Sequence, residues 1–412
     1  MIASLRLSFR MALRNLRRYA RRSIITGLTL SLGFFLMVFT IGLSEGSYRN
    51  VVDTAARSGT GHVTIRPQNL DPLEPVPLDD PAAIMEAVSA IPNAHAAPRV
   101  QGLVLASSAA GAHNVLALGV DPVVEVTSSI FPESLSDGEW LPTEPQRIPA
   151  AILGSGLAKR LDLELGDRLV LMAQVDNELE STLTRVRGLI TSGSDQIDDQ
   201  IVLLHAQALG ELLGQPGGMH EVAVVLDDLQ RSEEVRDALA TALPDVDVLT
   251  WSEALPEIGD LIRMDRQSAL YMFIVLFGIV GLAVLNAVLM SVLERVKEFG
   301  VLLALGTRPS TLFSIVILEA FLLALLSVAV GGLGGWWLVQ WLGQNGLDMG
   351  ALMQMEEMDL AGYDMSGVIY PYLPFARTFQ AVVMVISVTV FSSFYAAWKA
   401  ARISPVEAIS HV

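Results

Sequence analysis

The residue types that carry out chemistry in proteins occur in this sequence, but their spacing forms no catalytic or metal-binding pattern. The dipeptide Gly-Lys occurs nowhere, so the sequence contains no G-x-x-x-x-G-K-[ST] loop for nucleotide phosphates. The absence of cysteine excludes disulfides, thiolate metal sites and cysteine nucleophiles. The histidines show no H-E-x-x-H or other ligand spacing, and we predict structural or solvated roles for all of them: His62, His95, His113, His205, His220 and His411.

Serine and carboxylate patterns are equally uninformative about catalysis. Ser155 lies in Gly-Ser-Gly rather than in G-x-S-x-G, and Ser192 and Ser194 lie in a stretch typical of a flexible turn. The acidic segment "DQIDD" lacks the spacing and the terminal glutamate of an EF-hand. The sequence therefore predicts no catalytic residue, no metal site and no cofactor bound by this chain itself.

The most informative feature of the sequence is a set of long uncharged stretches. Of the 412 residues, 52% are hydrophobic, which indicates that lipid is part of the solvent. A helix needs about 20 residues to cross a hydrocarbon core of about 30 Å. Four stretches of at least 21 uncharged residues satisfy this length and predict four membrane helices: Ser23–Ser44, Gln267–Leu293, Ala320–Leu347 and Thr378–Trp398.

Charge is distributed unevenly around these spans, which predicts their orientation. Residues 1–22 hold seven arginines and no acid, whereas residues 45–267 hold 35 acids against 14 bases. Because Lys and Arg are retained on the cytoplasmic side, we expect both chain ends and residues 294–310 to be cytoplasmic. Residues 1–22 also fit a basic amphipathic helix on an anionic leaflet, and a simple topology signal is an equal alternative.

The region between the first two spans is large enough to fold as a domain outside the membrane. Charges alternate at i,i+4 spacing from Glu45 to Arg57, and apolar positions recur from Leu255 to Ala269, so both spans are predicted to extend outward as a stalk. Strand and helix patterns are interleaved over residues 60–250. This interleaving predicts an α+β domain with a small mixed sheet rather than a barrel.

Polar and small residues in the spans mark contact surfaces. Asn286 lies within the second span, and Glu319 immediately precedes the third uncharged run. Groups that are costly in lipid face protein or water, so we predict an interhelical hydrogen bond or a functional role for Asn286. Glu319 can alternatively lie near the cytoplasmic interface. Gly331 and Gly335 form a G-x-x-x-G packing surface, either within one subunit or between two.

The stretch "ERVKEFGVLLALG", Glu294–Gly306, joins the second span to the third on the predicted cytoplasmic side. It is charged on one side and apolar on the other, as expected of an element that docks a soluble partner. An ordinary charged loop that stops translocation is the alternative. The longer segment "NAVLMSVLERVKEFGVLLALGTRPSTLFSIVILEA" and the C-terminal "AAWKAARISPVEAI" resemble the two signatures of the MacB/FtsX/LolC/LolE permeases, the mechanotransmitting class of ABC transporters.

This resemblance implies a dimeric permease subunit driven by a separate cytoplasmic ATPase, which binds ATP and Mg²⁺. It also implies a bacterial inner-membrane location and a periplasmic domain with a porter-like part and an inserted part. The length of the chain and the long outside loop with "VIYPYLP", Val368–Pro374, look closer to lipoprotein-releasing LolC/LolE-type permeases. The residues that match the family's ATPase-coupling element are Glu294, Arg295, Lys297, Glu298, Phe299, Gly300, Leu305 and Gly306.

The sequence patterns and the resemblance together give the domain layout. The predicted segments are a cytoplasmic amphipathic helix (1–22), a first membrane helix with its stalk (23–58), a periplasmic domain (59–251) with an inserted subdomain at about 121–215, a second stalk and membrane helix (252–293), a coupling element (294–310), a third membrane helix (311–342), a periplasmic loop (343–377), a fourth membrane helix (378–398) and a cytoplasmic tail (399–412).

Three alternative functions are consistent with this domain layout. The first is release of lipoproteins, or another lipidated substrate, towards the outer membrane, with acyl chains entering between the first two spans at Phe34, Phe35, Val38, Phe273 and Phe277. The second is MacB-like export of periplasmic peptides, toxins or drugs with an adaptor. The third is FtsX-like signalling to a cell-wall hydrolase. The partner permease is expected to be an identical copy, with a paralogue as the alternative, and a periplasmic carrier remains an open partner.

Overall fold

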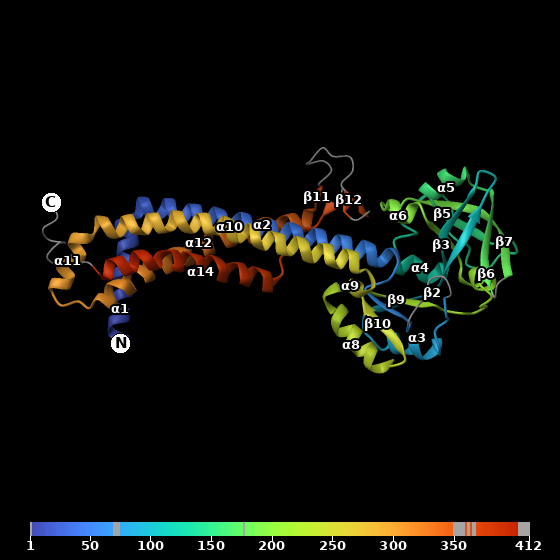
Figure 1. Cartoon of the computed structure of the whole chain (residues 1–412), viewed down its shortest axis with the longest axis horizontal. Coiled ribbons are helices and arrows are strands. Elements are labelled where there is room, and N and C mark those ends of the chain that lie inside the picture. The colour runs from blue at the N-terminus through green and yellow to red at the C-terminus, as the bar shows by residue number, and fades with distance from the viewer. Residues whose placement is uncertain are drawn as a thin grey trace. The chain divides into compact units, whose positions relative to one another are not determined.

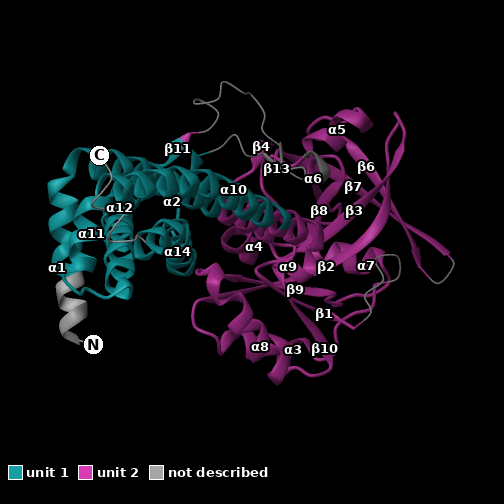
Figure 2. Ribbon diagram, turned by 60° about the vertical axis from the view of Figure 1, so that its left-hand side comes forward, with its two compact units in different colours: residues 1–47, 264–347, 368–412 teal, residues 48–263, 348–367 magenta. Residues whose placement is uncertain are grey.

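The computed structural model describes residues 2–68, 75–175, 178–348, 359–360, 363–364 and 368–402. The chain divides into two compact units (Figure 2). Unit 1 comprises residues 1–47, 264–347 and 368–412, and unit 2 comprises residues 48–263 and 348–367. Much of the predicted loop at 343–377 and the tail beyond residue 402 lie outside the described residues.

Unit 1 is helical, as its uncharged runs predict. Four of its helices are long and apolar enough to cross a membrane. The helices that contribute to it are α1 (Ile2–Arg18), α2 (Ala20–Ser58), α10 (Pro256–Glu294), α11 (Val296–Ala304), α12 (Pro309–Asn345) and α14 (Phe375–Ala401) (Figure 1). The predicted fold class, four membrane helices with a large α/β domain between the first two, is confirmed. Two-residue strands lie between α12 and α14: β11 (Leu347–Asp348) and β14 (Val368–Ile369), and, in the 348–367 segment of unit 2, β12 (Asp359–Leu360) and β13 (Tyr363–Asp364).

Small residues allow α2 and α12 to pack closely. A Cβ atom added at Gly335 would lie 2.9 Å from Val38, and one added at Gly331 would overlap the backbone of Ser31. The G-x-x-x-G pair therefore serves packing within one chain. Exposed tryptophans, Trp336, Trp337 and Trp341, lie near the end of α12, where amphipathic rings favour the membrane–water interface.

Both long helices that connect the units extend beyond the length of a bilayer. α2 and α10 have 39 residues each, which corresponds to about 58 Å at 1.5 Å per residue. Their unit 2 portions share one apolar cluster, in which Val52, Ala55, Ile258 and Ile262 are buried. These portions are the stalk that the sequence predicts.

Unit 2 is an α/β domain built on a ten-stranded sheet in the order β10-β1-β9-β2-β3-β8-β5-β7-β4, with β6 paired to β2 and β7. Its strands are β1 (Val63–Pro67), β2 (Ala94–Ser107), β3 (Ala112–Val120), β4 (Leu135–Gly138), β5 (Ala150–Gly154), β6 (Arg168–Val175), β7 (Glu178–Ile190), β8 (Ile201–His205), β9 (Glu221–Leu226) and β10 (Val246–Thr250). Its helices are α3 (Pro81–Ser89), α4 (Pro122–Ser128), α5 (Ser155–Leu161), α6 (Asp195–Asp198), α7 (Ala206–Leu212), the 3₁₀ turn η1 (Leu229–Arg231), α8 (Ser232–Ala242) and α9 (Trp251–Ala254).

Local sequence signals position several of these helices. Asp80 caps α3 by accepting a hydrogen bond from the backbone N–H of Ala83, and Asp121 caps α4 in the same way at Val123. Thr250 and Glu253 form a capping box at α9. Helices α3, α5 and α8 alternate with strands, as the interleaved patterns of residues 60–250 predict.

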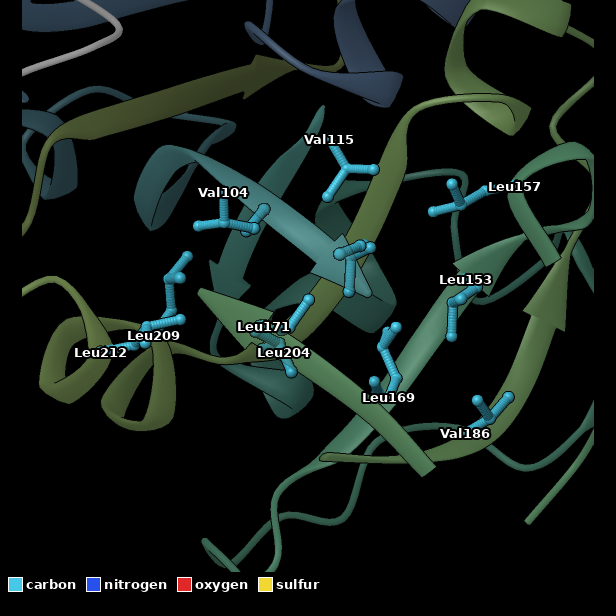
Figure 3. Packing of buried hydrophobic residues seen from close by; sticks show 14 of the residues in the cluster. Val104, Val115, Leu153, Leu157, Leu169, Leu171, Val186, Leu204, Leu209 and Leu212 are labelled. Atoms are coloured by element: carbon cyan, nitrogen blue, oxygen red, sulfur yellow. The ribbon is translucent and has the colours of Figure 1, made fainter. Parts of the chain in front are cut away.

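The expectation of a mixed sheet rather than a barrel is wrong for one half of unit 2. Strands β2, β3, β8, β5, β7 and β6 pair in succession, and β6 pairs back to β2, which closes a ring of six strands. Alternate side chains such as Leu169 and Leu171 fill its interior together with Leu153 and Leu204 (Figure 3). Closure satisfies the backbone groups that an open sheet would leave at its edges.

The other half of unit 2 is an open sheet covered by helices. β10, β1, β9 and the first part of β2 carry an apolar core with α3 and α8, in which Ile65, Ile84, Val224 and Val235 are buried. β2 belongs to both halves, since residues 94–99 pair with β9 and residues 99–107 pair with β3. The boundaries of an inserted subdomain at about 121–215 stay a prediction.

Candidate functional site

The candidate site is the connection between α10 and α12. α10 ends at Glu294, α11 begins at Val296, and the chain reverses at Gly306, whose φ of +88° favours glycine. The backbone N–H of Gly306 donates to Leu303 and that of Thr307 donates to Leu302, which closes the end of α11. Pro309 then starts α12. The amphipathic stretch is therefore a short helix held between two turns.

Arg295 and Phe299 anchor this helix in unit 1. Phe299 is 1% exposed in a cluster with Leu312 and Ala397, and Gly300 beside it is buried. The Arg295 side chain is 4% exposed and pairs with Glu319 at 3.3 Å and with Glu298 at 3.4 Å. Its guanidinium also lies 4.9 Å from the ring centroid of Phe299.

Contacts with Arg295 and Asn15 compensate the negative charge of Glu319. Besides Arg295, it accepts a hydrogen bond from the side-chain amide of Asn15 at 3.5 Å. The predicted cost of a carboxylate in a membrane helix is therefore offset by one cation and one amide. Because its partners come from α1 and from the start of α11, Glu319 lies near the end of the helix bundle, as the interfacial alternative predicts.

The N-terminal arginines supply contacts that sequence reasoning missed. Arg22 pairs with Glu294 at 3.4 Å, and Arg18 pairs with Glu298 at 3.0 Å. The i,i+4 repetition of arginine shows that α1 has a basic face, but it does not show which arginines meet acids. In α1 itself, Ala12 and Asn15 are buried, whereas Phe9 and Leu13 are exposed.

The predicted coupling residues therefore separate into two groups. Arg295, Phe299 and Gly300 are buried, and Glu294 and Glu298 are engaged by arginines of the same chain. The exposed positions form a surface that we call the coupling surface, and it consists of Lys297, Val301, Ala304, Leu305, Gly306 and Arg308. Leu305 is 79% exposed and Val301 is 49% exposed, so the coupling surface includes exposed apolar area.

The other predicted site residues lie inside or on the membrane helices. Phe34, Val38, Phe273 and Phe277 are buried in a core shared by α2, α10, α12 and α14, and Phe35 is partly buried. They pack as core in this structure rather than line an opening. Their role in acyl-chain entry stays a prediction.

The predicted role of Asn286, an interhelical hydrogen bond or a functional role, stays a prediction. Its side chain is exposed on α10, and within the described part of the chain it makes no hydrogen bond. The span is apolar on all sides, so periodicity could not show which face Asn286 occupies. Among the described residues, no group of acidic or histidine side chains is arranged to hold a metal ion.

Fold and site define a class of protein: a multi-pass membrane protein with one large α/β domain between its first two membrane helices and a short charged helix between its second and third. Two family models match it, the MacB-like periplasmic core domain over residues 23–242 and the FtsX-like permease C-terminal domain over residues 270–405. The chain belongs to this family of ABC transporter permeases.

Some relatives match this chain over nearly their whole length, whereas another is a longer protein of which this chain covers about half. It is 22% identical to the uncharacterized ABC transporter permease MJ1507 of Methanocaldococcus jannaschii, over 97% of this chain and 96% of the relative. It is 23% identical to the lipoprotein-releasing system transmembrane protein LolC of Xylella fastidiosa, over 98% and 99%. It is 24% identical to the macrolide export ATP-binding/permease protein MacB of Wolinella succinogenes, over 82% of this chain and 54% of the relative.

Proposed function

We propose that this ABC transporter permease couples ATP hydrolysis by a separate subunit to movement of unit 2, and that its substrate is a lipoprotein of the bacterial inner membrane. The main support for the proposal is that α2 and α10 are each continuous over 39 helical residues. α11 follows α10 after a single residue, Arg295. A displacement of α11 would therefore move the stalk through helical backbone.

The coupling surface is the proposed contact with the ATPase, which binds ATP and Mg²⁺. Val301 and Leu305 offer exposed apolar area, and Lys297 and Arg308 offer flanking positive charge. Buried Arg295 and Phe299 fix α11 to α12, so a push on this surface would not be lost in local motion. The arginine-rich N-terminus supports cytoplasmic chain ends and a cytoplasmic ATPase.

A second copy of the permease is the proposed partner inside the membrane. Asn286 presents a side-chain amide on an exposed face of α10, where hydrocarbon offers no hydrogen bond. Gly278 lies two turns earlier, and a Cβ atom there would meet open space. Two copies related by a two-fold axis could pair their Asn286 amides, which supports a homodimer.

The lipoprotein substrate is supported by the relatives rather than by a residue. The likeness to LolC covers nearly all of both chains, whereas this chain spans about half of the MacB relative from Wolinella succinogenes. Co-purification with the cognate ATPase followed by mass spectrometry tests the substrate. A triacylated peptide would support lipoprotein release, whereas a soluble peptide or drug would support MacB-like export and a cell-wall hydrolase would support FtsX-like signalling.

Mechanical coupling is tested by a Gly-Pro insertion after Tyr48 or after Met264, which breaks α2 or α10. We expect ATP hydrolysis and complex assembly to persist while transport is lost. The same insertion after Gly111, in the exposed turn between β2 and β3, is the control. Retained transport in the helix-breaking variants would contradict the mechanism.

A further inference from the structure

A pocket lies among the ends of α1, α2, α10 and α12 inside unit 1, and the proposed transport cycle does not use it. All its walls come from the end of the bundle where α10 stops and α12 starts. The residues that line it are Leu16, Tyr19, Arg22, Ser23, Thr26, Ala287, Val288, Ser291, Val292, Arg295, Phe299, Val316, Glu319, Ala320 and Leu323.

The lining changes from charged to apolar along the helices. Arg22, Arg295 and Glu319 carry the charges, whereas Thr26, Ala287 and Leu323 lie one to two turns further along α2, α10 and α12 from these three residues. A helix rises about 1.5 Å per residue, so this gradient covers roughly 6–12 Å. Lipid headgroups and the first carbons of their acyl chains meet over a similar depth.

Charge around the pocket favours an anion. The pocket lining holds two cations, Arg22 and Arg295, against one anion, Glu319. Glu319 and Glu298 already share Arg295, which is buried. Arg22 is different, since its side chain is 28% exposed and that of its partner Glu294 is 48% exposed. Exposed pairs of this kind are weak, so a phosphate could replace Glu294 at Arg22.

We propose that this pocket binds an anionic phospholipid from the leaflet on the side of the N-terminus. Arg22 binds the phosphate, the Tyr19 and Ser23 hydroxyls lie beside it, and one acyl chain follows Ala287, Ala320 and Leu323. Mostly apolar walls favour a lipid over free phosphate. Lipid binding at this pocket needs the membrane but not the ATPase. This proposal can therefore be tested independently of the proposed function.

Native mass spectrometry of the full-length permease tests this site, after release from nanodiscs containing phosphatidylglycerol and phosphatidylcholine. We expect one retained phosphatidylglycerol per protomer. Arg22→Gln should weaken its retention by about tenfold or more, the loss expected for a charge-assisted contact. Arg21→Gln is the matched control, because Arg21 is adjacent, exposed and absent from the pocket lining.

Two further measurements separate the sources of phosphate and guard against misfolding. Ala287→Leu fills the apolar part of the pocket and should displace the lipid while all charges remain. Inorganic phosphate at millimolar concentration should leave the lipid bound. Equal retention in Arg22→Gln and the wild type, equal loss in both arginine variants, or displacement by inorganic phosphate would each overturn the proposal.

Discussion

Buried charge in unit 2 is concentrated where β2 passes from one half of the domain to the other. Arg99 is 1% exposed and pairs with Glu125 at 2.5 Å, and its cross-strand neighbour on β9 is Glu221. Burial raises the pKa of the Glu221 carboxyl above its ordinary value of 4.5, although Arg99 and Arg66 act in the opposite direction. Glu221 is therefore more easily protonated in the folded protein than in the unfolded chain.

This shift predicts a pH-dependent effect of Glu221→Gln. Below pH 4.5 the Glu221 carboxyl is protonated in both the folded and the unfolded state. As pH rises, the carboxyl ionises first in the unfolded chain. The free energy of unfolding therefore falls until the pH passes the raised pKa of the folded state. We expect the melting temperature of the wild type to fall relative to that of Glu221→Gln between pH 4.5 and 8.

Glu253 provides a control of opposite sign. The backbone N–H of Thr250 donates to its carboxylate and lowers the pKa of Glu253. Its stabilising effect should be present above pH 4.5 and lost as pH falls, so Glu253→Gln should be less stable than the wild type only at higher pH. A wild type that gains stability over Glu221→Gln as pH rises would contradict the assignment.

The Arg295–Glu319 pair predicts a strongly non-additive effect of mutation. Arg295→Met leaves Glu319 with the Asn15 amide as its hydrogen-bond partner among the described residues, and removing one partner of a buried pair costs about 3–5 kcal/mol. The double variant Arg295→Met/Glu319→Gln should recover much of that loss. Thermal unfolding of the four proteins of this cycle in detergent measures the coupling, and additive effects would show that the two side chains act independently.

At the scale of elements, the segment before α14 packs against α2 through glycine. A Cβ atom at Gly46 would lie 2.5 Å from the carbonyl oxygen of Tyr370, and the backbone N–H of Tyr372 donates to the carbonyl of Gly42 at 2.9 Å. Nearby, Glu45 pairs with Arg266 of α10 at 2.7 Å and with Arg377 of α14 at 3.6 Å. Three elements therefore meet on one turn of α2.

Gly46→Ala is expected to disturb this junction. The added methyl group meets backbone that cannot rotate away, so we expect destabilisation of about 1–3 kcal/mol and a lower melting temperature. Gly59→Ala is the matched control, since Gly59 lies just beyond the end of α2 and a Cβ atom there meets nothing within 4 Å. Equal melting temperatures for the two variants would show that the 370–372 segment moves freely.

Element types followed from the sequence more readily than element partners. Uncharged runs predicted all four membrane helices, and the interleaved helix and strand patterns of residues 60–250 predicted a domain of both element types. Ring closure by β6 was not predictable, because alternation along Leu169 and Leu171 is the same in an open sheet and a closed one. Seven similar arginines likewise gave no sign that Arg18 and Arg22 meet Glu298 and Glu294.

At the scale of the whole molecule, function depends on what the coupling surface touches. Leu305→Glu adds a charge at a position that is 79% exposed, so the fold should be unaffected. We expect the variant to lose co-purification with the ATPase. Leu179→Glu in β7, at 76% exposure, is the matched control and should retain the ATPase. Full ATPase binding by Leu305→Glu would place the contact elsewhere.

The strand shared by both halves of unit 2 also limits how this domain can be taken apart. The closed ring begins with β2 and β3, which precede residue 121, so excision of residues 121–215 would remove four of its six strands. Two long hydrogen-bonding rims would be left facing water, together with the apolar lining of the former interior. Such a trimmed chain should precipitate or self-associate, and swapping this segment between relatives will require exchanging β2 and β3 with it.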